Sequence, residues 1–419
     1  MQRTKVDIRK DLVRGSLIGG AAGDALGYAV EFNSYQDICA RYGKSGIRSY
    51  ELHNGLALIS DDTQMSLFTA NGILLEQTRF YMRGVIHSPE HSVKIAYRDW
   101  YYTQTLSFKS VMEQEREQRL FRFTWLSAIP ELYACRAPGN TCLTAIKDLI
   151  ERRTPQNHSK GCGGVMRIAP WPLFCACNYL GSFAEEEDID IVGGKIAYLT
   201  HKHPLGWIPA VLLTHIIYRI VHRCKFVEID KASFIMEFIS IVKDSLQELP
   251  KLVPGESFFD VKEDIKKPIG ELFPKEVTQQ IKLIERALCL AENNLSDIDN
   301  IKNLGEGWVG EEALAIAIYA VARHIDSFED ALVAAVNHDG DSDSTGAVAG
   351  NIMGAIVGYE HIPQKFKEHL ELHDLILSMA DDLHQGCIIN EYNTDETPAQ
   401  RQWYDRYCKM KASSTQLNP

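Results

Sequence analysis

The sequence predicts a mainly helical fold, and two observations support this. First, runs typical of strands, in which apolar and polar residues alternate, are few. Apolar residues instead recur at helical spacings of three and four over residues 8–28, 63–76, 205–222, 230–247, 311–325 and 329–336. Second, two apolar segments carry glycine at every fourth position. These glycines are Gly15, Gly19, Gly23 and Gly27 in the first segment, and Gly346, Gly350, Gly354 and Gly358 in the second.

The glycine stripes predict two central helices that pack closely. An interior glycine costs a helix about 1 kcal/mol relative to alanine, so a run of them requires a compensating gain. A stripe of small residues supplies one, because it lets two helix backbones approach each other. A pair of loops is the alternative, but the Ala, Leu, Ile and Val content of both segments favours helices.

Composition places the chain among ordinary globular proteins, with 419 residues, 45% apolar residues and a net charge of −12. The acidic balance argues against nonspecific binding to nucleic acid or to an anionic membrane, since both need basic surface.

The longest apolar stretch, 206–221, is too short and too interrupted to span a bilayer, and predicts a buried core helix. The charged N-terminus lacks the pattern of a secretory signal. Ten cysteines without CxxC pairs favour a reducing cytosol, so we expect a cytoplasmic protein.

Acidic residues lie at the ends of the predicted helices. Glu31 follows the first glycine-striped segment, HDGDSDS (338–344) precedes the second, and ISDDTQM (59–65) opens a third apolar helical pattern. Taken singly, each cluster is better explained by helix capping, with Asp61, Asp343 or Ser344 as caps. Their joint occurrence beside core helices favours a shared hard cation, because buried carboxylates are costly without one.

The ligand types narrow the choice of cation. Oxygen ligands without accompanying His or Cys suit Mg²⁺, Mn²⁺ or Ca²⁺. An EF-hand calcium loop starting at Asp339 fails, since Ser344 occupies the position of the turn glycine and Gly350 that of the bidentate glutamate.

Two further segments are candidates for ligand contact. SKGCGGVMRIAPWP (159–172) has three glycines before an apolar run, and such a loop can present backbone N–H groups to phosphate. Turns with positive φ angles explain these glycines nearly as well, and Arg167 could be an arginine at the edge of the core. LTHKHPLGW (199–207) offers His201 and His203 before the long apolar helix, where a capping role competes with ligand contact.

Taken together, these motifs resemble the ADP-ribosylglycohydrolase family, which includes dinitrogenase reductase activating glycohydrolases and ADP-ribosylarginine and ADP-ribosylserine hydrolases. The resemblance covers residues 12–363 and is loose over 76–130 and 180–300. It rests on the order and spacing of GSLIGGAAGDALGYAVEF, SDDTQM, RAPGNTC, KGCGGVMRIAP, THKHPLG, GEGWVGEEALAIAIY and NHDGDSDSTGAVAGNIMGAIVG.

The resemblance implies an all-α orthogonal multi-helix bundle with a di-metal cleft. It further implies one domain over 1–390, with insertions near 76–130 and 225–300, and a C-terminal tail over 391–419. Two Mg²⁺ ions, with Mn²⁺ as a substitute, are expected on Ser60, Asp61, Asp62, Asp341, Asp343 and Ser344. Serine stands at Ser60 and Ser344 where many members have threonine, and it retains the hydroxyl ligand.

The resemblance also assigns the remaining site residues. Glu31 and Asp62 are the expected acid/base carboxylates, and Glu31 gates the cleft. ADP-ribose is expected to contact Gly161, Cys162, Gly163, Gly164, His201 and Trp308, the last at the adenosine end or the cleft rim. Cys162 replaces a residue that is frequently asparagine.

The expected activity is hydrolysis of the glycosidic bond between ADP-ribose and a modified protein, with ADP-ribosylarginine as the preferred substrate. Nucleic acid is expected only as a modified substrate, and no membrane partner is expected. Two other roles remain open. The protein could be an immunity-type protein that binds and blocks an ADP-ribosyltransferase, with or without hydrolysis, or a silent relative with a structural role. The intact set of carboxylates argues against the silent relative.

Overall fold

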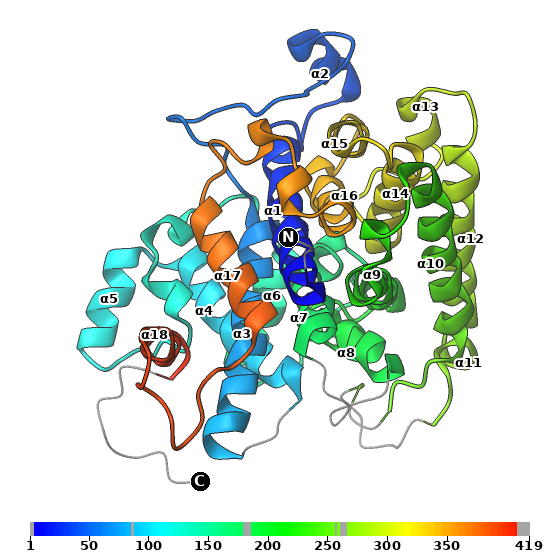
Figure 1. Ribbon diagram of the computed structural model, residues 1–419. Helices are drawn as coiled ribbons and strands as arrows, with labels where there is room; N and C mark the ends of the chain where they lie inside the picture. The colour runs from blue at the N-terminus through cyan, green and yellow to red at the C-terminus, as the bar shows by residue number, and fades with distance from the viewer. Residues whose placement is uncertain (1–3, 85–87, 179–185, 256–257, 260–265, 409–419) are drawn as a thin grey trace.

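The computed structural model describes residues 4–408 except 85–87, 179–185, 256–257 and 260–265. Among these residues the regular elements are helices, with only isolated β-bridges, which confirms the predicted all-α class. Helix α1 (Lys5–Tyr28) runs through the middle of the molecule beside α16 (Ser342–Val357) (Figure 1). The helices that pack against one or both of these two are α3 (Asp61–Arg83), α7 (Pro170–Asn178), α9 (Pro204–Arg223), α14 (Gly310–Arg323), α15 (Phe328–Val336) and α17 (His373–Gln385).

The remaining helices cover this centre from both sides (Figure 1). They are α2 (Tyr35–Tyr42), α4 (Pro89–Thr105), α5 (Phe108–Arg116), α6 (Asn140–Ile150), α8 (Glu186–Tyr198), α10 (Phe234–Glu248), α11 (Ile269–Leu272), α12 (Pro274–Ala291), α13 (Asp297–Ile301) and α18 (Pro398–Tyr407). Short 3₁₀ turns connect them at η1 (Trp125–Ala128), η2 (Pro130–Tyr133), η3 (Cys162–Gly164), η4 (Lys225–Val227), η5 (Lys231–Ser233), η6 (Leu249–Lys251), η7 (Tyr359–His361) and η8 (Gln364–Phe366).

The two glycine stripes face each other, as the sequence predicted. A Cβ added at Gly15 would lie 2.3 Å from the carbonyl oxygen of Gly354, and one added at Gly23 would lie 1.9 Å from that of Gly346. Residues early in α1 thus meet residues late in α16, so the two helices run antiparallel. No side chain fits between backbones this close, and the glycines are therefore a packing requirement.

The antiparallel pairing sets the position of the acidic segments. The C-terminal end of α1 meets the N-terminal end of α16, where a Cβ at Gly27 would lie 2.2 Å from the carbonyl oxygen of Ser342. Glu31, four residues beyond Gly27, is thereby brought to the first turn of α16. Packing of two apolar helices thus decides where the charged residues gather.

Helix α9 is the apolar segment that the sequence predicted as a core helix. By length and composition alone it could cross a membrane, but 89% of its apolar window is buried inside the protein. Its N-cap is His203, whose Nδ1 accepts a hydrogen bond from the Leu205 amide at 3.1 Å, so this histidine has the capping role. Pro209 lies inside the helix.

The polar segment after residue 390 contains a packed helix, α18. Its Trp403 is buried, and the indole Nε1 donates to Thr78 Oγ1 of α3 at 3.0 Å. Residues 398–407 therefore belong to the folded body, which the polar composition of the segment did not indicate. Residues 409–419 of the predicted tail lie outside the described residues. The regions predicted as insertions hold α4, α5, α10, α11, α12 and α13, and their status as insertions stays a prediction.

Gly23→Ala should destabilise the protein by about 1–3 kcal/mol or more, because the added methyl group overlaps the Gly346 carbonyl and forces α1 and α16 apart. Thermal and urea unfolding measure the loss. Gly139→Ala is the matched control, because its Cβ would meet only Cys142 Sγ at 3.9 Å and the change should cost about 0.5 kcal/mol. Equal stability of the two variants would contradict the close packing.

Candidate metal centre and ADP-ribose site

The first acidic motif forms the N-terminus of α3. Ser60 is the N-cap, and its hydroxyl accepts a hydrogen bond from the Asp62 amide at 3.2 Å. Asp61 and Asp62 occupy the first turn, and all three side chains are buried. The positive end of the helix dipole favours carboxylates at these positions. The cap is therefore Ser60, although the sequence suggested Asp61 for that role, and the carboxylates of Asp61 and Asp62 are left for other partners.

Asp24 of α1 holds this motif in place, and the sequence analysis did not single it out. Its carboxylate accepts hydrogen bonds from the Ser60 amide at 3.0 Å, from the Thr63 amide at 3.1 Å and from the Thr63 hydroxyl. Burial raises the pKa of Asp24 to about 6, and these bonds oppose the rise. The sequence contained a signal for this role, because Asp24 is the one charged residue between Arg14 and Glu31 and lies within a mostly apolar stretch.

The second acidic motif forms the N-terminus of α16. Asp341 is the N-cap and accepts a hydrogen bond from the Ser344 amide at 3.2 Å. Asp343 and Ser344 follow in the first turn, and all three are buried. The Asp341 amide donates to the Glu306 carbonyl oxygen at 2.8 Å, which attaches this turn to the loop before α14. The cap is therefore Asp341, although the sequence suggested Asp343 or Ser344 for that role.

The two motifs face each other in one buried cluster. One carboxylate oxygen each from Glu31, Asp341 and Asp343 lies within 4.8 Å of the other two. The charge of Asp341 acts on both Asp61 and Asp62, and the Ser344 hydroxyl is a hydrogen-bond partner of Asp62. The structure thus brings together the seven residues predicted for metal binding and catalysis: Glu31, Ser60, Asp61, Asp62, Asp341, Asp343 and Ser344.

The electrostatics of this acidic cluster favour the binding of a cation. Burial, with repulsion from neighbouring carboxylates, raises the pKa of Glu31 to about 9 and that of Asp61 to about 8. The pKa values of Asp62 and Asp343 are also well above the usual range for the same reasons. Glu31 Oε2 and Asp62 Oδ2 are buried without a hydrogen-bond partner. Carboxylate and hydroxyl oxygens arranged in this way fit a hard divalent cation.

The glycine loop lies beside the cluster, in 3₁₀ turn η3. The Cys162 amide donates to the Trp308 carbonyl at 3.2 Å, and the Gly161 amide donates to Ser159 Oγ at 3.3 Å. Because these two amides already have acceptors, the amides of Gly163 and Gly164 are the ones left for the predicted phosphate contact. None of the three glycines has a positive φ, so the alternative of a left-handed turn is wrong. A Cβ at Gly164 would lie 2.3 Å from the Gly206 carbonyl oxygen, which makes close packing the reason for that glycine.

His201 lies against the glycine loop as a neutral imidazole. Burial, together with the charge of Arg167, lowers the pKa of His201 to about 3. Arg167 donates to Thr200 Oγ1 at 2.6 Å, and that oxygen lies 2.9 Å from His201 Nδ1. Because Arg167 donates to the Thr200 oxygen, the Thr200 hydroxyl proton is available to Nδ1, which favours the proton of His201 on Nε2. This Nε2 would lie 3.3 Å from a Cβ at Gly163, so it faces the loop.

Arg167 itself is fully buried, and an arginine at the edge of the core is therefore the wrong description. Its guanidinium lies 4.7 Å from the ring centroid of Tyr97 and contacts Cys142 Sγ at 3.2 Å. These contacts stabilise a buried cation that in turn orients Thr200 and His201.

Cys162 lies inside the site, against the acidic cluster, whereas Trp308 lies at its solvent-exposed edge. Burial and the charge of Asp341 raise the pKa of the Cys162 thiol well above its usual value, and Asp341 and Ser344 are its hydrogen-bond partners. Cys162 therefore contacts the acidic cluster itself. Trp308 is 39% exposed and stacks on Phe32, so it lines the rim. The sequence left two positions open for Trp308, the adenosine end and the cleft rim. The exposure of Trp308 and its stacking on Phe32 support the rim.

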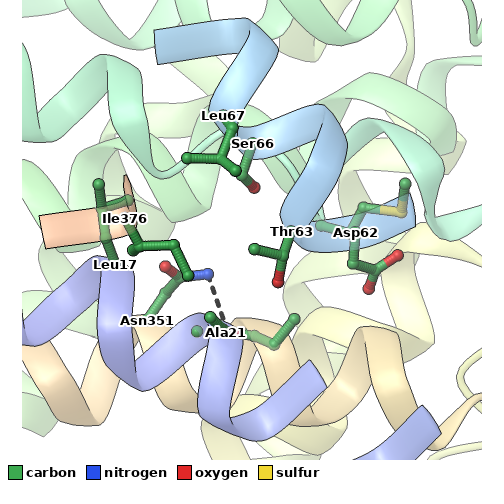
Figure 2. A pocket seen from close by; sticks show the side chains of 11 residues that line it. Leu17, Ala21, Asp62, Thr63, Ser66, Leu67, Asn351 and Ile376 are labelled. Carbon is green, nitrogen blue, oxygen red and sulfur yellow. Dashed lines mark hydrogen bonds between the residues drawn. The ribbon is translucent and has the colours of Figure 1, made fainter. Parts of the chain in front are cut away.

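A small cavity lies behind the first turn of α3 (Figure 2). Asp62 and Thr63 stand at one side, with Leu17 and Ala21 of α1 and Asn351 of α16 opposite. Its volume of about 20 Å³ has room for one water molecule. The cavity is too small for a nucleotide.

Comparison with known proteins shows the family to which the chain belongs. The family model described as ADP-ribosylglycohydrolase matches residues 5–392, nearly the whole chain. The chain belongs to the ADP-ribosylglycohydrolase family. A solved structure titled "ADP-ribosylglycohydrolase-related protein complex" has the same fold, with a TM-score of 0.52 and 18% identity over 90% of this chain and 98% of that chain.

Individual members of the ADP-ribosylglycohydrolase family are distant in sequence. ADP-ribosylhydrolase ARH3 of Gallus gallus is 24% identical over 57% of this chain and 61% of its own length, so the chain spans about three fifths of the ARH3 relatives it matches. ADP-ribosyl-[dinitrogen reductase] glycohydrolase of Rhodospirillum rubrum is 23% identical over 86% of this chain and 91% of its own length. ADP-ribosylarginine hydrolase Tri1 of Serratia proteamaculans is 36% identical over a 72-residue segment, 17% of this chain and 19% of its own.

Without metal, the protein should become less stable as the pH rises. The folded-state pKa values of Glu31 and Asp61, about 9 and about 8, lie above their unfolded values. Their protonation therefore stabilises the fold fully below the unfolded pKa values, and this stability is lost as the pH rises through about 8 to 9. Melting curves in chelator between about pH 5 and pH 9 measure the loss.

Saturating Mg²⁺ should flatten this pH dependence, because the cation stabilises the ionised carboxylates. In Glu31→Gln the side chain cannot ionise, so the fall in melting temperature with rising pH in chelator should be smaller. A melting temperature in chelator that does not change with pH would contradict the charge accumulation in the acidic cluster.

Asp24→Asn should lower both the stability and the metal response, because one amide oxygen cannot replace a carboxylate that accepts three hydrogen bonds. We expect a loss of about 1–3 kcal/mol, measured by urea unfolding, and a smaller rise in melting temperature on adding Mg²⁺. Asp11→Asn, on the same helix, is the control, and a normal metal response in Asp24→Asn would argue against a positioning role.

Proposed function

We propose that the protein is a Mg²⁺-dependent hydrolase that releases ADP-ribose from a modified protein, with ADP-ribosylarginine as its substrate. The observation that carries this proposal is the buried convergence of Glu31, Asp341 and Asp343 opposite Asp61 and Asp62. The family match and the hydrolase names of its relatives support the reaction. The arginine linkage is supported by the similarity to Tri1, an ADP-ribosylarginine hydrolase.

Two Mg²⁺ ions, for which Mn²⁺ can substitute, would be held by Ser60, Asp61, Asp62, Asp341, Asp343 and Ser344. When bound, such ions orient the ribose hydroxyls, polarise the sugar and acidify a water molecule. The two ligand sets come from the N-termini of two different helices, and their buried carboxylates would lie close to a sugar bound at the cluster. In this role they supply negative charge close to the oxocarbenium-like transition state.

The reaction adds a water oxygen to the anomeric carbon of the ribose and breaks the bond from that carbon to the guanidine nitrogen, which takes up a proton. Glu31 and Asp62 are the candidates to transfer this proton, because each has one buried oxygen without a protein partner. The neutral His201 and the amides of Gly163 and Gly164 would donate hydrogen bonds to the ADP-ribose.

We also place the protein in the cytoplasm. All ten cysteines are free thiols in the structure, which suits a reducing compartment.

The decisive experiment measures ADP-ribose release from an ADP-ribosylarginine protein, with Mg²⁺ and with chelator. Asp62→Asn and Asp341→Asn should each lower kcat/KM by about a hundredfold or more, because each removes a charged oxygen ligand. Asp339→Asn is the matched control. It lies two residues before Asp341 but accepts the Tyr35 amide at 2.7 Å, a bond that the asparagine oxygen can retain.

Full activity in Asp62→Asn, or equal activity in chelator, would overturn the proposed mechanism. If the protein releases no ADP-ribose from arginine-linked, serine-linked or nucleic-acid-linked substrates but retains an ADP-ribosyltransferase in a binding assay, the role of an inhibitory partner replaces hydrolysis.

A further inference from the structure

Two exposed aromatic side chains stack on each other at the rim of the acidic cluster. The rings of Phe32 and Trp308 have centroids 5.9 Å apart and are inclined by 19°. Phe32 is 73% exposed and Trp308 is 39% exposed, so much of the surface of this pair faces solvent. We call the two residues the rim pair. Large aromatic rings exposed in this way indicate a binding surface, since each would gain free energy from burial.

The backbone attaches both members of the rim pair to the candidate site. Phe32 directly follows Glu31, whose carboxylate belongs to the acidic cluster. The Trp308 carbonyl accepts the Cys162 amide, and its neighbour Gly307 packs against Asp341, where a Cβ would lie 3.3 Å from the Asp341 carbonyl oxygen. The rim pair is therefore attached through the backbone to both the glycine loop and the acidic cluster.

The chemistry of this position favours a planar cation. An aromatic face attracts a guanidinium, and the surrounding carboxylates add negative potential. The adenine ring of ADP-ribose also stacks on aromatic rings, but the diphosphate and a second ribose separate it from the scissile bond. Phe32 adjoins Glu31, at the reacting end. The group that reaches the rim pair is therefore the leaving group, which lies on the far side of the scissile bond from the ADP-ribose.

We propose that the rim pair selects the leaving group, by stacking the guanidinium of ADP-ribosylarginine on the exposed face of Phe32 while Trp308 supports that ring from the other side. This inference rests on the proposed function and names the residues that determine its substrate specificity. It predicts that the rim pair contributes to binding of the arginine-linked substrate and contributes nothing to binding of ADP-ribose itself, in place of the ADP-ribose contact that the resemblance implied for Trp308.

The test compares a ligand that carries the guanidinium with one that lacks it. KM and kcat are measured on an ADP-ribosylarginine substrate, and free ADP-ribose is titrated as a competitive inhibitor. Phe32→Ala and Trp308→Ala should raise KM for the arginine-linked substrate on the order of fivefold, the usual effect of losing one cation–π contact. The inhibition constant of ADP-ribose should stay unchanged. Phe32→Tyr, which keeps the aromatic face, should restore KM.

Phe121→Ala is the matched control, since Phe121 is a similarly exposed phenylalanine, at 53%, outside the site. An equal rise in KM and in the ADP-ribose inhibition constant would overturn the inference, because the rim pair would then bind the ADP-ribose moiety. Unchanged KM in both alanine variants would also overturn it. If the unaltered protein fails to cleave the arginine linkage, the proposed function fails first, and that result is separate from any effect of Phe32.

Discussion

The contact between the glycine stripes of α1 and α16 is the constraint on which the site depends. Along the two stripes, the carbonyl oxygens of one helix lie where the other helix would carry a Cβ, so the glycines must face each other in this register for the backbones to approach this closely. This register places Glu31, just beyond α1, beside Asp341 and Asp343 at the start of α16. The carboxylate oxygens lie within 4.8 Å of one another, and a displacement of one turn along the helix axis would move Glu31 about 5 Å farther away, too far for a shared cation.

The packed core supports an arrangement that is unfavourable for the acidic residues themselves. Buried carboxylates with raised pKa values destabilise the fold when ionised, and Asp24 compensates only by fixing the backbone of the first motif. The free energy of helix packing therefore maintains a cluster of negative charge. Ligands gathered before a cation arrives would raise its affinity, because less ordering remains to be done on binding.

The sequence predicted which acidic residues gather in one cluster but not how they are supported. Glycine spacing and acidic motifs are local patterns, so Asp61, Asp62, Asp341 and Asp343 could be identified without the structure. The role of Asp24 could not, because its partners Ser60 and Thr63 are distant in sequence and only the pairing of α1 with α3 brings them together. The stacking of Phe32 on Trp308 was equally hidden, since 276 positions separate the two residues. The polar composition of α18 concealed its docking through Trp403.

The sequence by itself determined the all-α class, the two close-packed glycine helices and the kinds of oxygen ligand available, because periodicity, small-residue stripes and side-chain chemistry are properties of short segments. The tertiary structure decided which carboxylates meet, which of the glycine-loop amides are already paired, and which aromatic rings form the rim. These depend on contacts between residues far apart in the chain, and such contacts follow from the register in which α1 and α16 pack.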